Sequence, residues 1–203
     1  MQAQKFMPFP PTPAKERKKV FFQFTLMTLM ALVMGGMLEK LLMPAFEKRA
    51  LTAVTTHFEI PFHYCDTAWD WLLCILRYAL PDLITLTVIF LAAFTFLNYI
   101  ITDLALVYAG GRLGLSFLLL TKSSGISFAH RTIFLLFHGL MLALIWLYAC
   151  QSALLSFHLK RFSSVGRLST APLEALRLLL FTFLYAVFAF ILDGLYCLLI
   201  YIT

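Results

Sequence analysis

The feature of this sequence that most constrains its fold is an apolar stretch of about forty residues, from Leu80 to Thr121. As one helix it would reach roughly 60 Å, which is twice the hydrocarbon thickness of a bilayer. The stretch therefore has to fold back on itself. The best break lies between Asn98 and Asp103, because Thr102-Asp103 can cap a new helix. We predict one span over about 80–101, with Pro81 in its first turn, and the next over about 103–121.

Three further apolar runs are long enough to cross a bilayer, at about 20–43, 131–157 and 172–203. The chain is 62% hydrophobic and 13% charged, whereas soluble domains are about 45–50% apolar and about 25% charged. We predict an all-α, polytopic membrane helix bundle with about five transmembrane helices in one transmembrane domain, 20–203. The first run is too long for a cleavable signal peptide and should remain as an anchor.

Two segments are expected outside the bilayer. Residues 1–19 form a basic, proline-rich tail, and residues 44–79 form an external segment. Within the latter, 66–78 has apolar residues at helical spacing, namely Trp69, Leu72, Leu73 and Leu76. We interpret 66–78 as an interfacial amphipathic helix that lies on the bilayer. A helix packed on the ends of the spans would have the same pattern.

The distribution of basic residues distinguishes a topology with four spans from one with five. Lys and Arg number 16 against 10 acids, and they cluster beside the apolar runs. Five spans give an excess of Lys and Arg on one side, whereas four spans give almost no bias, so the positive-inside rule favours five. We expect a multi-pass protein of the cell membrane with a cytoplasmic N-terminus and an external C-terminus. No pattern typical of nucleic-acid binding accompanies the charge.

Charged side chains at membrane depth are the natural candidates for a site, because each is costly there. Arg112 in the third predicted span needs a carboxylate, backbone carbonyls or a watery cavity, and Asp193 and Asp103 are the candidate partners. A functional polar site, a structural ion pair and a snorkelling arginine all remain open. Asp193 alone could mark a proton or cation path, but without a second acid deep in its span we favour a helix-packing or gating role.

The positions of the histidines and cysteines do not form a pattern typical of a cofactor site. His138 lies in the fourth span, but no histidine at matching depth in another span could complete a haem site, so we expect no cofactor. His57, His63 and Cys65 are close together, but their spacing matches no standard zinc site and we expect no metal. Cys65 and Cys74 share one loop and are candidates for a disulfide if that loop faces an oxidising side.

Glycines mark candidate helix contacts, at Gly35, Gly36, Gly110, Gly111 and Gly114. Such residues let neighbouring helices approach closely. For the pair Gly35-Gly36 a simple kink is an equal alternative. No phosphate-binding loop, nucleophile elbow or metalloprotease motif occurs, so we do not expect an enzyme. The remaining enzymatic alternative would use His57, His63 or Cys65.

The order of features resembles the stage II sporulation protein M family of bacterial integral membrane proteins. The resemblance consists of a basic tail, the first-span motif Val33-Met34-Gly35-Gly36 and a stretch with several glycines over 110–117. It also includes a run of small residues over 149–160 that ends in a basic residue, and Asp193 as the one acid deep in the last span. It implies a non-enzymatic membrane scaffold. Family members in endospore formers act in engulfment and hold peptidoglycan-degrading partners at the septum. No functional position can be matched residue by residue.

From these observations we expect a multi-span scaffold that binds other membrane or envelope proteins, or a second copy of itself, through its external segment and glycine-lined faces. The alternative is a transporter or channel subunit with a polar intramembrane site at Arg112 and Asp193.

Overall fold

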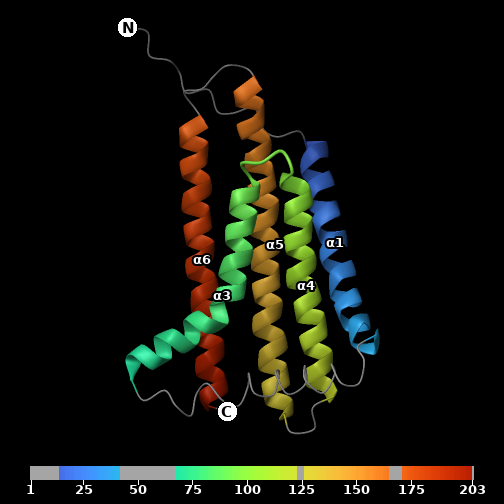
Figure 1. Cartoon of the computed structure of the whole chain (residues 1–203), viewed down its shortest axis with the longest axis vertical. Coiled ribbons are helices and arrows are strands. Elements are labelled where there is room, and N and C mark those ends of the chain that lie inside the picture. Colours follow the sequence, from blue (N-terminus) through green and yellow to red (C-terminus); the bar gives the residue numbers. More distant parts are fainter. Residues whose placement is uncertain (1–13, 42–66, 123–125, 165–170, 203) are drawn as a thin grey trace.

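The computed structural model describes residues 14–41, 67–122, 126–164 and 171–202. These residues form five helices and no strand (Figure 1), namely α1 Ala14–Leu41, α3 Ala68–Ala92, α4 Asn98–Lys122, α5 Phe128–Ser164 and α6 Ala171–Ile202. Each of the five is long and apolar enough to cross a bilayer. The predicted all-α bundle of about five membrane helices is therefore confirmed.

The helices run alternately up and down, so that α1 begins at one end of the bundle and α6 ends at the other (Figure 1). The α4 helix packs along α1 on one side and touches α3 on another. The α5 helix contacts each of the other four helices, and α6 packs on α3 and α5. The centre of the bundle thus lies around α5 and the inner faces of α3, α4 and α6.

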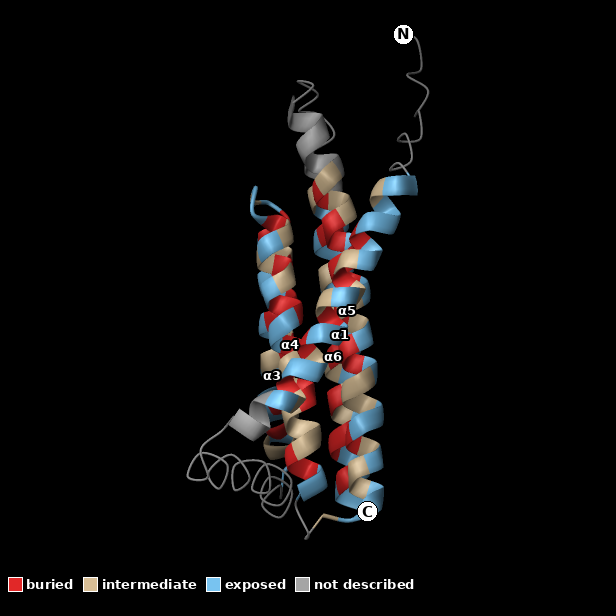
Figure 2. Cartoon of the chain, turned by 90° about the vertical axis from the view of Figure 1, so that its right-hand side faces the viewer, coloured by how far each residue is buried: buried red, intermediate tan, exposed pale blue. Residues whose placement is uncertain are grey.

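The outer surface of the bundle is apolar, unlike that of a water-soluble bundle. Buried side chains face the helix contacts and exposed ones cover the outside (Figure 2). Many exposed residues are large and apolar, particularly on α6, where they include Leu179, Phe183, Phe188 and Leu195. An apolar outer surface of this kind suits contact with lipid.

The α3 helix differs from the expected layout. It is one continuous helix from Ala68, whereas we predicted an interfacial helix followed by a separate span beginning near 80. Thr67 and Asp70 form a capping box at its start: the Thr67 hydroxyl accepts from the Asp70 backbone N–H, and the Asp70 carboxylate accepts from the Thr67 backbone N–H. This cap begins the helix twelve residues before the predicted span.

Pro81 lies inside α3, not in its first turn. Proline has no N–H to donate and its ring crowds the preceding turn, so helices bend at such positions. In Figure 1 the first part of α3 leans away from the bundle and the rest runs alongside α4 and α5. We call the part of α3 before Pro81, residues 68–80, its leaning part. Four of its apolar residues are exposed, namely Trp69, Leu72, Leu73 and Leu76.

The turn between the second and third helices comes earlier than predicted. It occupies residues 93–97, and Asn98 to Asp103 lie in the first turns of α4. Thr102 does not cap a helix but donates its hydroxyl to the Asn98 side-chain oxygen at 3.1 Å. Hydroxyls add to the backbone hydrogen bonds at the end of α3: Thr95 donates to the Ala92 carbonyl at 2.9 Å, and Ser156 of α5 donates to the Ala93 carbonyl at 2.7 Å.

Candidate functional site

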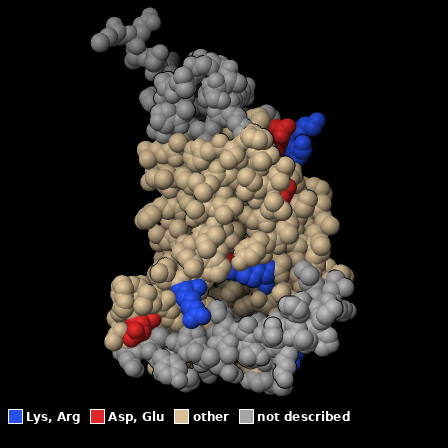
Figure 3. Space-filling model, viewed as in Figure 1, with Lys and Arg blue, Asp and Glu red and all other residues tan. Residues whose placement is uncertain are grey.

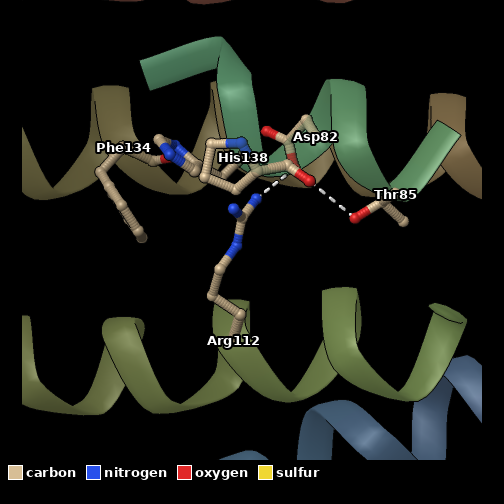
Figure 4. A network of polar contacts seen from close by, with 6 residues as sticks. Asp82, Thr85, Arg112, Phe134 and His138 are labelled. Carbon is tan, nitrogen blue, oxygen red and sulfur yellow. Dashed lines mark hydrogen bonds and ion pairs between the residues drawn. The ribbon is translucent and has the colours of Figure 1, made fainter. Parts of the chain in front are cut away.

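The partner of Arg112 is Asp82. The Arg112 guanidinium of α4 donates to an Asp82 carboxylate oxygen of α3 across the helix contact (Figure 4). Asp82 directly follows Pro81, where α3 bends. Its side chain is 3% exposed, whereas that of Arg112 is 29% exposed. The ion pair thus has a buried acidic end and a basic end that is still partly accessible.

The two predicted partners of Arg112 lie in different places. Asp103 accepts a hydrogen bond from the Gln23 side-chain amide of α1 at 2.7 Å, so it belongs to the α1–α4 contact. Asp193 of α6 is 5% exposed and lies within electrostatic range of both Asp82 and Arg112. Its Oδ2 atom has no hydrogen-bond partner among the described residues. The bundle therefore holds two buried carboxyl groups around one guanidinium.

Aromatic rings close one side of this cluster. The His138 ring of α5 stacks on Phe134 with 4.1 Å between centroids and meets the edge of Tyr196 of α6 at 4.8 Å. The ring centroid of Tyr196 in turn lies 6.0 Å from that of Tyr78 of α3. His138 Nδ1 is 3.2 Å from the Phe134 carbonyl oxygen. Since a carbonyl oxygen only accepts, Nδ1 is the protonated nitrogen.

A cavity of about 210 Å³ lies beside the ion pair. Figure 3 shows a hollow in this face of the molecule next to basic side chains. The polar residues that line the cavity are Arg77, Asp82, Arg112, Ser116 and His138, and its apolar wall includes Met141, Leu142 and Ile145. Because liquid water occupies about 30 Å³ per molecule, the space suits a few waters or a small polar solute.

The predicted glycines meet at a separate contact between α1 and α4. A Cβ atom built on Gly35 would overlap the Gly111 carbonyl, and one on Gly114 would overlap the Leu32 carbonyl. One on Gly110 would lie 3.0 Å from the Thr28 carbonyl oxygen. One on Gly36 would lie 3.0 Å from Leu118 Cδ1, whereas one on Gly111 would meet only ordinary contacts. Backbone therefore packs on backbone here, and α1 continues without interruption through Gly35-Gly36.

The remaining sequence candidates do not join the cluster. Cys65, His57 and His63 lie outside the described residues, so the Cys65–Cys74 disulfide and the weighed zinc ligands fall there too. Cys74 is buried in α3. In the described parts of the chain, no three His, Cys, Asp or Glu side chains are arranged to hold a metal ion.

Asp82 is the site residue that sequence reasoning missed. A span that begins near 80 puts this acid at a membrane boundary, where it needs no explanation. The missing signal was Thr67-Ala68-Trp69-Asp70, whose spacing is that of a capping box. A helix that begins there carries Asp82 into its middle, at a depth where a buried acid requires a basic partner.

Comparisons with protein-family models, with curated proteins and with solved structures give no match to this chain.

Proposed function

We propose that this chain is a transporter or channel subunit that binds a small polar solute or ion inside its helix bundle. The observation that carries the proposal is the Asp82–Arg112 ion pair, which joins two membrane helices and lines a cavity of about 210 Å³. Helix contacts in folded proteins are close-packed and leave few voids larger than a water molecule. This pair instead borders open space.

The arrangement supports solute binding in three ways. Arg112 is partly accessible and presents a planar set of donors suited to an anionic or carbonyl group. Asp82, Ser116 and His138 supply further polar atoms on the same cavity. The bend of α3 at Pro81, directly beside Asp82, is a natural hinge for opening the pair.

Flux through reconstituted liposomes tests the proposal. The purified protein is assayed with a panel of small inorganic ions and small charged organic solutes. Arg112→Leu should abolish the flux of the solute that the wild type carries, and Lys122→Leu, at the far end of the same helix, should retain it. Both variants must elute from gel filtration like the wild type. Absence of flux for every solute in the panel would refute the proposal.

A second proposal is the membrane scaffold expected from the sequence, of which the resemblance to stage II sporulation protein M is a part. The glycine-lined faces of α1 and α4 pack on each other, so they offer no surface to a partner. The support comes from the leaning part of α3, whose exposed Trp69, Leu72, Leu73 and Leu76 face away from the core. Replacing these four by serine should abolish co-purification of a partner from mild detergent; a protein with no partner in either form argues against a scaffold.

We also propose a cell-membrane location with the N-terminus in the cytoplasm and the C-terminus outside. The support is the basic start of α1, with Lys15, Arg17, Lys18 and Lys19, together with the odd number of candidate spans among the described residues. Single cysteines introduced in a variant without native cysteines, at Lys122 and at Arg167, should be labelled from opposite sides by a membrane-impermeant reagent. Labelling from the same side would contradict this topology.

A further inference from the structure

The buried groups around Arg112 do not balance in charge. Asp82 and Asp193 contribute two carboxyl groups that are nearly inaccessible, and Arg112 contributes one guanidinium. If both acids were ionised, the cluster would carry one surplus negative charge inside an apolar bundle. An uncompensated charge in such surroundings is costly, so proteins neutralise it with a bound cation or a proton.

A proton fits this structure better than a metal ion. In the described residues, no three His, Cys, Asp or Glu side chains form a metal site. Asp193 Oδ2 accepts no hydrogen bond from the described residues and is fully enclosed. A carboxylate oxygen without a donor is the least stable form of a buried acid, whereas a neutral carboxyl group tolerates such a place.

Three groups interact with Asp193 directly, namely Asp82 of α3, Arg112 of α4 and Tyr196 of α6 itself. Tyr196 is in turn surrounded by Tyr78 of α3, His138 of α5 and Cys197 of α6. Arg77 is exposed and lines the same cavity as Asp82. Only His138 competes as a proton carrier, because an imidazolium there would also balance the charge. Its ring is stacked on Phe134 and bounded by Tyr196, and its Nδ1 lies 3.2 Å from the Phe134 carbonyl oxygen, so a His138 variant is part of the test below.

We propose that Asp193 holds an exchangeable proton and that a proton is the ion that this site couples or conducts. The inference deepens the proposed transport function and rests on it for the coupling step alone. Asp82 interacts electrostatically with Asp193 and also lines the cavity, so we assign it as the route by which the proton leaves. When the Asp193 carboxyl group loses its proton to the cavity, two carboxylates compete for Arg112, and the Asp82–Arg112 pair is free to open.

Infrared spectroscopy of the full chain in lipid nanodiscs tests this assignment, because a protonated carboxyl group has a carbonyl stretching band that a carboxylate lacks. The wild type should show the band of a buried protonated carboxyl at neutral pH. Asp193→Asn should remove it. Asp70→Asn, which alters an acid at the exposed start of α3, should leave it unchanged. A wild type without the band, or a band that survives Asp193→Asn, overturns the proposal.

Asp82→Asn gives the sharper result, because it leaves Asp193 in place. With Asp82 neutralised, Asp193 alone can balance Arg112, so Asp193 should ionise and the band should disappear. Arg112→Leu has the opposite effect and should roughly double the band, since both acids then become neutral. His138→Gln should retain the band. Persistence of the band in Asp82→Asn would show that enclosure alone protonates Asp193, and the charge-balance argument would be wrong.

The proposed function can fail separately from this inference. If the band responds as expected but no solute crosses the liposome, transport is refuted while the proton assignment stands. If flux depends on Arg112 but is equal with and without a pH gradient, and is unchanged by Asp193→Asn, the transport function stands and proton coupling is refuted.

Discussion

Two regions of this bundle hold helices together by opposite means. At the α1–α4 contact, glycines remove side chains so that the backbone of one helix rests on the backbone of the other. At the cluster around Arg112, side chains from three helices reach toward one another and leave a cavity. The first region gains stability from close approach, and the second gives up close packing for charged groups and space.

The two regions share one helix. Consecutive residues of a helix are turned by about 100°, so Arg112 lies roughly opposite to Gly110 and Gly114. Gly110 and Gly114 of α4 therefore face α1, and Arg112 faces α3. The tight contact fixes α4 against α1, and this rigid pair is the wall from which Arg112 extends. A site that has to open and close is more precise when one of its walls does not move.

The strongest test of this comparison is a side chain at Gly114. Gly114→Leu places atoms where the Leu32 carbonyl and the Gly36 backbone lie, and backbone atoms cannot move aside as a side chain can. We expect a loss of more than about 3 kcal/mol in the free energy of unfolding, measured in detergent by denaturant titration, or failure of the protein to fold. A variant as stable as the wild type would mean that α1 and α4 do not pack through these glycines.

The second test breaks the polar cluster. Asp82→Leu removes the acid that bonds to Arg112 directly, and removing one partner of a buried ion pair is strongly destabilising. We expect a loss of about 2 kcal/mol in the free energy of unfolding, less than for a fully buried pair, because Arg112 still reaches water and an ionised Asp193 can balance part of its charge. The same titration in detergent measures it.

The double variant Asp82→Leu/Arg112→Leu sharpens the result. With both charges replaced by apolar groups, we expect most of the stability to return, while any flux stays abolished. That separation would show that the cluster serves function at the expense of packing. A double variant as unstable as Asp82→Leu alone would instead assign the pair a structural role.

The two regions were not equally accessible from the sequence. The glycines on α1 and α4 stand out because few other features occur in those apolar runs, and their type alone indicates a close helix contact. Which glycine meets which, however, depends on the register of two helices that are far apart in the sequence, and no local pattern contains it.

The polar cluster was harder to predict, for a physical reason. Its position depends on where α3 begins, and apolar composition alone puts that start near 80 and not at Ala68. The turn at 93–97 was missed for a similar reason, because Ala93, Phe94 and Phe96 look like the interior of a span. The side chains that satisfy the end of α3 include Ser156 from a distant helix. The number of spans follows from bulk hydrophobicity, whereas the site follows from caps and distant hydroxyls.

A third test concerns a side-chain link within the glycine region. Gln23 of α1 donates to Asp103 of α4 at 2.7 Å, so this contact is not made by backbone alone. Gln23→Leu should cost about 1.5 kcal/mol in the free energy of unfolding, because it removes a donor from a partly buried acid. Thr25→Val is the control, since the Thr25 hydroxyl bonds only within its own helix. Equal effects of the two changes would remove Gln23–Asp103 as a link between α1 and α4.

The smallest effect is expected at a glycine that belongs to neither region. Gly139 lies inside α5, and a Cβ atom built on it would meet nothing within 4 Å. Gly139→Ala therefore adds no clash, and it reduces the conformational freedom of the unfolded chain. We expect a gain of about 0.5 kcal/mol in the free energy of unfolding, opposite in sign to any substitution at Gly114. If Gly139→Ala were instead as destabilising as Gly114→Leu, loss of stability could not be attributed to the α1–α4 contact, because glycine itself would be required wherever it occurs in this bundle.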